Sequence, residues 1–150
     1  MFSIKSFLTF LAILVYPTTA FYSTLFPRYF TGVTEGLTCK YRNIKHALIV
    51  ISKSPTPKLE TTFISAKVVP FGRKFYLVGK TKNSLRPFLY FKIIHSCTAF
   101  DKNSYKRIYV IGIPKKYIAR SRRISLFNVR KIELSKLPGK LVKHAAIWRG

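Results

Sequence analysis

Short apolar and β-branched runs, separated by proline, glycine and polar residues, divide most of this chain into strand-sized segments. Residues 87–97 are apolar almost throughout and rich in aromatic and β-branched side chains, which is typical of a strand buried on both faces. Periodicity alone also allows a buried helix. Pro87 fits the first residue of such a strand, because proline cannot donate a hydrogen bond to the ladder.

Six further segments have a strand pattern. They are residues 35–41, 46–52, 61–69, 74–78, 105–113 and 124–134. A Pro/Gly turn at 70–72 separates the third and fourth segments along the chain and predicts that these two form a hairpin. In 105–113, Tyr109, Ile111 and Ile113 share one face. The mixed pattern of 124–134 indicates a bulge near Asn128 and Val129.

The remaining parts of the body have weaker patterns. Residues 21–34 have no clean period and predict an extended lead-in. Residues 140–149 place Leu141, Val142, Ala145 and Trp148 at helical spacing, as in a helix lying on an acidic membrane. The segment is shorter than the roughly 12 to 15 residues that an isolated helix needs in water. A frayed or sandwich-packed tail is therefore favoured.

Seven short strands with turns between them, and no helical pattern in the body, predict an all-β protein with a β-sandwich fold. No repeat or domain boundary divides residues 21–150, so we expect one domain with a basic C-terminal tail. About 130 residues suffice to bury roughly two thirds of the unfolded surface of such a domain.

Residues 1–20 have the pattern of a secretory signal peptide. Lys5 precedes an apolar run at 7–16, and Pro17 and Ala20 follow it. The run is too short for a bilayer span, which needs about 20 residues in a helix. The alternative is a buried N-terminal strand or helix. The sequence therefore predicts a secreted, extracellular protein whose mature chain begins near Phe21.

The chain has two cysteines, Cys39 and Cys97. In a secreted protein they are most simply paired with each other, and the bond contributes on the order of 4 kcal/mol. Two buried free thiols are the alternative if the chain is not exported. His95 shares a strand face with Cys97, but two residues do not make a metal site, and an oxidised cysteine is no ligand. No metal or cofactor is expected.

The charge balance is extreme, with 28 Lys and Arg against 4 Asp and Glu. Such a surface attracts polyanions. The predicted anion-binding surface consists of Lys115, Lys116, Arg120, Arg122, Arg123, Arg130 and Lys131. Export favours an anionic membrane surface or a sulfated glycan as partner, or a cell-surface receptor, over nucleic acid. The alternating aromatic and basic residues at 105–109 would suit nucleic acid, but are typical of one buried and one solvated strand face.

Four ordered motifs resemble the transthyretin-like family of secreted nematode proteins. They are Gly-Leu-Thr-Cys at 36–39 with Ala-Leu-Ile-Val at 47–50, the Gly-bounded segment 72–79, the strand 87–97 with its His-Ser-Cys end, and Ile-Pro-Lys-Lys-Tyr at 113–117. The resemblance implies a transthyretin-type Greek-key β-sandwich and an extracellular location, without an established catalytic activity. Tyr105 stands where members commonly have a third cysteine, and this chain is more basic than is usual there.

Catalytic patterns are weak. Four scattered acidic residues offer no carboxylate pair for acid–base chemistry. The terminal Trp148-Arg149-Gly150 is similar to the Tyr-Arg-Gly-Ser end of 5-hydroxyisourate hydrolases, relatives of transthyretin, but the serine and a His-rich motif are missing. We therefore predict a binding protein without catalytic residues. The alternatives are a 5-hydroxyisourate hydrolase-like enzyme and a carrier of a small apolar ligand.

The export prediction is tested by the intact mass of protein secreted from a eukaryotic host. We expect a chain that begins near Phe21, in which alkylation labels Cys39 and Cys97 only after reduction. An uncleaved chain with two free thiols would contradict it and would make nucleic acid a possible partner again.

Overall fold

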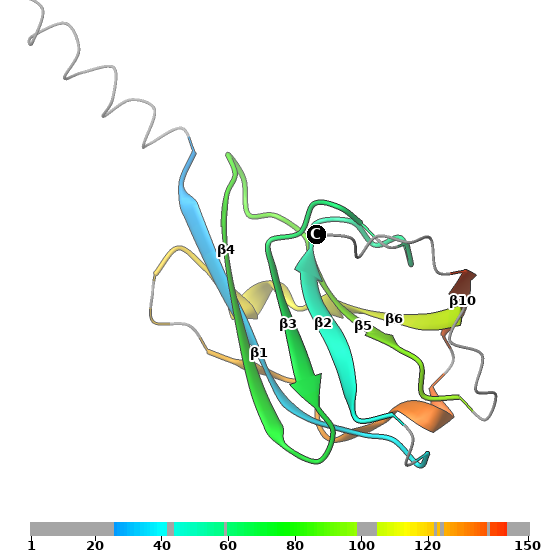
Figure 1. The fold of residues 1–150 in the computed structure, drawn as a ribbon. Coiled ribbons are helices and arrows are strands. Elements are labelled where there is room, and N and C mark those ends of the chain that lie inside the picture. Colours follow the sequence, from blue (N-terminus) through cyan, green and yellow to red (C-terminus); the bar gives the residue numbers. More distant parts are fainter. Residues whose placement is uncertain are drawn as a thin grey trace, which may run out of the picture.

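A computed structural model describes residues 26–41, 44–58, 60–98, 105–121, 123, 125–137 and 139–143. Over these ranges the chain forms two β-sheets that pack against each other (Figure 1). The predicted all-β sandwich is therefore confirmed, with ten strands and two short 3-10 turns rather than seven strands. The predicted signal peptide at 1–20, Arg122 and residues 144–150 lie outside the described part of the chain.

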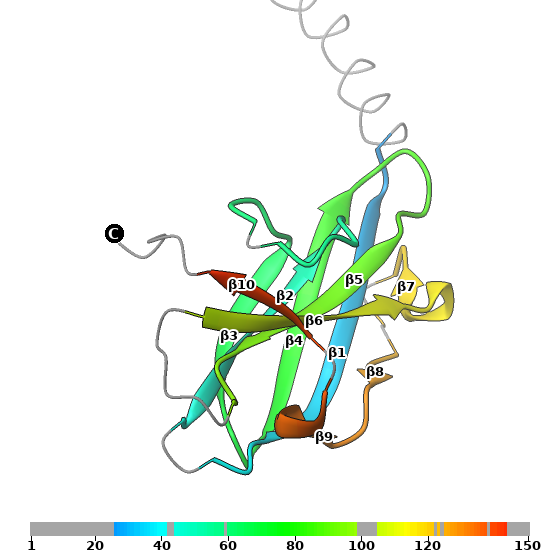
Figure 2. The same ribbon diagram turned by 90° about the vertical axis from the view of Figure 1, so that its right-hand side faces the viewer.

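The first sheet is built on β1 (Arg28–Thr38). On one side β1 pairs antiparallel with β4 (Lys74–Lys82) from Arg28 to Gly36. On its other side three short strands follow each other along β1: β7 (Ile118–Ala119) antiparallel, then β8 (Phe127–Asn128) and β9 (Ile132–Glu133), both parallel. Figure 2 shows these short strands along the β1 edge.

The second sheet has the order β10 (Lys140–Lys143), β6 (Tyr105–Ile113), β5 (Leu89–His95), β2 (His46–Ser52) and β3 (Ser65–Pro70). Every pair in it is antiparallel. β5 is the central strand, and six of its seven residues are buried. The prediction of a strand buried on both faces is confirmed, although it begins two residues after Pro87.

Alternate residues of β5 face the first sheet and form the main core. Leu89, Phe91 and Ile93 are buried there against Val33 and Leu77 from the first sheet. The rings of Phe75 and Phe91 stack across the sheets with centroids 5.9 Å apart. Each such side chain stabilises the fold by about 1.5 to 3 kcal/mol through burial. The core therefore holds the two sheets together.

The predicted hairpin between the third and fourth strands is wrong. β3 pairs with β2 and β4 pairs with β1, so the two strands lie in different sheets. The turn carries the chain across the sandwich: Phe71 N–H donates to Lys45 O and Gly72 N–H donates to Leu37 O, each at 2.9 Å. Gly72 has φ +79°, which glycine adopts without strain. A local turn signal shows that the chain reverses and leaves the choice of partner strand open.

Two strands are longer than the sequence predicts. β1 begins at Arg28, inside the expected lead-in, and β4 continues through Gly79, the expected stop. At Gly79 an added Cβ would lie 2.9 Å from Ile64 Cγ2 and 3.3 Å from Ile51 Cδ1. This glycine therefore allows close packing between the sheets and does not end the strand.

The last predicted strand, 124–134, is also corrected. It forms the two short strands β8 and β9, with Arg130 between them at φ 61°. Asn128 Oδ1 accepts a hydrogen bond from Arg130 N–H at 2.8 Å, which supports this left-handed residue. The segment is thus broken rather than bulged. Residues 140–143, for which a helix was the alternative, form the edge strand β10.

The outer face of β5 is covered by the loop after β2. Lys92 is 1 % exposed in the middle of β5, and its Nζ lies 2.6 Å from Glu60 Oε1 and 2.7 Å from Thr56 O. The Ser52 hydroxyl donates to the other oxygen of Glu60. Burial opposes ionisation of this carboxyl, but the hydrogen bonds and charge of Lys92 outweigh it and hold the pKa of Glu60 below its usual value. Lys92 therefore ties the loop to the sheet.

We expect Glu60→Gln to destabilise the protein more than Lys92→Met. Glutamine leaves the buried ammonium of Lys92 without its counter-ion and costs about 3 to 5 kcal/mol. Methionine fills the same volume without charge, and the Glu60 side chain, 19 % exposed, can turn to water, so this change costs about 1 to 2 kcal/mol. Urea unfolding of both variants and of the double variant measures this. A smaller loss for Glu60→Gln would contradict the prediction, whereas the double variant should resemble Lys92→Met.

Candidate anion-binding surface

Four of the predicted basic residues lie around a single 3-10 turn and the strand that follows it. Pro114 ends β6 and opens the turn η1 (Lys115–Tyr117), where its carbonyl accepts a hydrogen bond from Tyr117 N–H at 2.9 Å. β7 then pairs with Phe30 and Thr31 near the start of β1. We define the basic cluster as Lys115, Lys116, Arg120 and Arg123, all of which are exposed.

Aromatic rings position two cations of the basic cluster, Arg120 and Lys115. Nε and Nη2 of Arg120 each lie 3.3 Å from the hydroxyl oxygen of the buried Tyr29, and the guanidinium carbon is 5.6 Å from the centroid of that ring. Lys115 Nζ lies 4.6 Å from the ring centroid of Phe88. These contacts hold the charges at the surface without neutralising them.

The structure does not bring all seven predicted residues together. Arg130 and Lys131 lie between β8 and β9, beside the later part of β1. At about 3.3 Å per strand residue, this places them roughly 15 Å along β1 from β7. Arg122 lies outside the described residues. The predicted surface is therefore a basic cluster at one end of β1 and a separate pair further along it.

Three more cations lie close to the basic cluster and were not predicted. Arg28 is paired with Lys82 in the β1–β4 register, and Arg86 follows in the β4–β5 loop. Asn83 N–H donates to Pro27 O at 3.2 Å, which joins this loop to the start of β1. All three cations are exposed. They are far apart in the sequence, and only the register of β1 with β4 brings them to one end of the sandwich.

Acidic side chains do little to offset this charge. Of the three acidic residues described, Glu60 is paired with Lys92 in the only ion pair found in the described ranges. Glu133 accepts hydrogen bonds from Ser135 and from Lys40 N–H. Burial opposes its ionisation, but these bonds hold the pKa of Glu133 below its usual value. The basic cluster therefore presents its charge to solvent.

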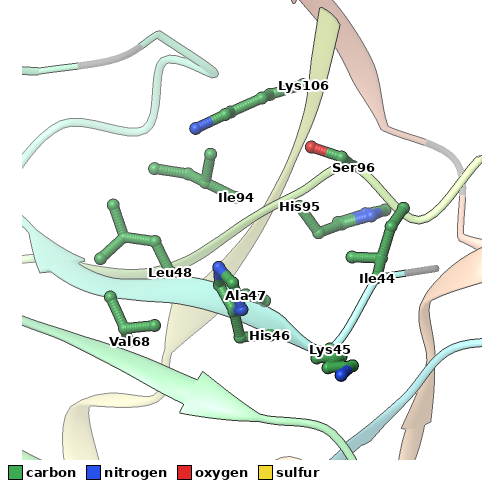
Figure 3. A pocket seen from close by; sticks show the side chains of 10 residues that line it. All are labelled: Ile44, Lys45, His46, Ala47, Leu48, Val68, Ile94, His95, Ser96 and Lys106. Carbon is green, nitrogen blue, oxygen red and sulfur yellow. The ribbon is translucent and has the colours of Figure 1, made fainter. Parts of the chain in front are cut away.

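A hollow of about 510 Å³ lies on the outer face of the second sheet, away from the basic cluster (Figure 3). Its apolar lining includes Leu48, Val68 and Ile94, and Lys106 extends toward Ile94. His46 also lines it. The hollow thus combines apolar side chains with the cations Lys45 and Lys106, and the alternative of a carrier for a small apolar ligand stays a prediction.

His95 is 2 % exposed and borders this hollow at the end of β5. Its Nδ1 accepts a hydrogen bond from Cys97 N–H at 3.1 Å, so the neutral ring carries its proton on Nε2. Nε2 has no hydrogen-bond partner among the described residues. Burial, and then the nearby charge of Arg107, lower the pKa of His95 to about 4. His95 is therefore neutral at ordinary pH.

Cys39 and Cys97 form a disulfide with an S–S distance of 2.02 Å, so the predicted pairing is confirmed. The bond joins the residue after β1 to the second residue after β5 and links the two sheets. A disulfide is typical of an oxidising compartment.

The described residues contain no group of three or more His, Cys, Asp or Glu placed to bind a metal. None of the helical segments they form has the length and hydropathy of a membrane span.

Comparisons with known proteins leave the family open. No protein-family model, no curated protein and no solved structure matches the chain. The resemblance to the transthyretin-like family therefore stays a prediction from the sequence motifs.

We expect the free energy of unfolding to fall as the pH is lowered from about 6.5 to 5. The folded pKa of His95, about 4, lies below the unfolded value of about 6.5, so the unfolded chain binds an extra proton in this range. Glu60 and Glu133 contribute little there, because their carboxyls are largely ionised in the unfolded chain and their pKa values are lower still in the folded protein. Urea unfolding across this range should show a shallower slope for His95→Asn, which keeps an acceptor but does not titrate. An unchanged slope would contradict the assignment.

Proposed function

We propose that this protein is a secreted, extracellular binding protein with a transthyretin-type sandwich, and that it engages anionic lipids or glycans on cell surfaces. The observation that carries the proposal is the basic cluster at one end of the sandwich. Its four cations are exposed, Lys115 and Arg120 lie over aromatic rings, and none forms an ion pair with an acidic residue that the structure describes. Such a surface attracts polyanions over a distance of about a Debye length.

The strand order supports a Greek-key sandwich. β5 pairs with β2, although β3 and β4 lie between them in the sequence. After β3 the chain crosses to the first sheet, where β4 pairs with β1, and it then returns to the second sheet as β5. Greek-key connections produce such pairings between strands that are not consecutive. The motifs at 36–50, 72–79, 87–97 and 113–117 add the transthyretin-like type to this proposal.

Export is proposed on two features. The first 20 residues have the charge and apolar pattern of a signal peptide. The disulfide between Cys39 and Cys97 fits the oxidising conditions of the secretory route. Binding rather than catalysis is proposed for a separate reason. Cys97 is oxidised, and Nδ1 of His95 accepts a hydrogen bond from the Cys97 backbone N–H, so these two residues cannot act together as a nucleophile and its base.

Reversing the basic cluster should weaken binding to anionic surfaces. Each cation near an anionic membrane contributes about 1 kcal/mol, so Lys115→Glu, Lys116→Glu, Arg120→Glu and Arg123→Glu together should lower affinity by about two to three orders of magnitude. The measurements are co-sedimentation with vesicles of phosphatidylserine in phosphatidylcholine and retention on immobilised heparin. Added salt should weaken both for the unaltered protein.

A matched control separates the basic cluster from net charge. Four exposed cations lie outside the basic cluster: Lys45 just before β2, Lys67 in β3, Arg73 just before β4 and Lys74 at its start. Reversing them changes the net charge by the same amount, and binding should fall much less. Equal losses in both variants would show that only net charge matters, and no loss in either would overturn the proposed function.

A further inference from the structure

Three large apolar side chains are exposed next to the basic cluster. Leu85 is 76 % exposed, Phe88 64 % and Phe26 46 %. Leu85 and Phe88 belong to the loop between β4 and β5, and Phe26 precedes β1. In both views of the ribbon this loop and the start of β1 lie side by side at one end of the molecule (Figures 1 and 2). Apolar side chains grouped in this way mark an interaction site.

Hydrogen bonds and a buried proline hold the group in place. Asn83 N–H donates to Pro27 O at 3.2 Å, and Asn83 Nδ2 donates to Leu85 O at 2.9 Å. Pro87 is buried and anchors the loop to the sandwich. Leu85 and Phe88 are three residues apart, which keeps their backbones within about 10 Å of each other. The loop therefore presents its apolar side chains outward from a fixed base.

Cations surround these apolar side chains. Lys115 of the basic cluster lies 4.6 Å over the Phe88 ring. Arg86 lies between Leu85 and Phe88 in the sequence and is exposed. Arg28 follows Phe26 after one residue and is paired with Lys82. Leucine and phenylalanine amid lysine and arginine are the combination found in segments that lie in the interface of an anionic bilayer.

We propose that this end of the sandwich docks on an anionic phospholipid bilayer, with Leu85, Phe88 and Phe26 entering the interface and the surrounding cations contacting lipid phosphates. The inference rests on the proposed function and narrows it from anionic surfaces in general to a membrane. A sulfated glycan offers charge but no apolar phase, so it leaves the exposed leucine and phenylalanines without a role. The bilayer accounts for the charge and for the apolar side chains together.

The test removes the apolar side chains and keeps every charge. In Leu85→Ser/Phe88→Ser, partitioning into vesicles of phosphatidylserine in phosphatidylcholine should fall about tenfold for each side chain. Retention on immobilised heparin should not change. The matched control is Tyr76→Thr/Val78→Thr, because these side chains are 58 % and 52 % exposed on β4, outside this loop. Both activities should be unchanged in the control.

Each outcome distinguishes this inference from the proposed function. Unchanged vesicle partitioning in Leu85→Ser/Phe88→Ser, with loss in the charge-reversed variant, would overturn membrane insertion and leave the basic cluster as the binding surface. Loss of heparin retention together with vesicle binding would also overturn it, because the loop would then only support the basic cluster. No loss in either variant would overturn both proposals.

A second measurement follows insertion directly. Phe88→Trp in a Trp148→Phe background has a single tryptophan in the loop. Its emission should shift to shorter wavelength on phosphatidylserine vesicles, and brominated lipid should quench it. Emission that stays unquenched while the protein is vesicle-bound would overturn the proposal.

Discussion

The structure depends on burying both faces of β5. On the inner face, Phe91 and its neighbours pack against the first sheet, which is ordinary sandwich packing. On the outer face Ile94 packs with Val50 and Ile108. Lys92 is also buried on this face, so a counter-ion and a carbonyl must be brought to it. Glu60 and Thr56 supply these groups from the loop after β2. The buried Lys92 thus determines where the loop after β2 lies, and this loop covers the outer face of β5.

β1 is the corresponding organiser of the first sheet. Its start pairs with β7, and its end pairs with β9 and leads into the disulfide that reaches the end of β5. Short strands of two residues can bind there because β1 is long and is held on its other side by β4. The basic cluster is therefore held at the edge of β1 through β7, although the segment it belongs to has only the short turn η1 and the two-residue strand β7.

Charge and apolar exposure coincide at one end of the molecule. The four acidic residues of the chain are too few to compensate its cations, and two of the three that are described are engaged with internal partners. Most of the positive charge is therefore not neutralised within the protein. At the end where β1 begins, the β4–β5 loop adds exposed apolar side chains to this charge. Positive charge is spread over the whole chain, but only this end combines it with the exposed apolar side chains of the β4–β5 loop, so the two ends of the molecule differ.

Local pattern alone identifies β2, β6 and the doubly buried β5, because their alternation and β-branched content are properties of each segment. The sequence also predicts the disulfide, since two cysteines can form only one pair within a chain. Tertiary structure decides what depends on partners distant in the sequence: the separation of β3 and β4 into different sheets, the close packing at Gly79, and the buried Lys92. It also splits the predicted basic residues into a cluster and a distant pair and adds Arg28, Lys82 and Arg86 through the β1–β4 register. The physical reason is that hydrophobic and charge patterns specify which face of a segment is buried, whereas strand partners are selected by packing across the whole core.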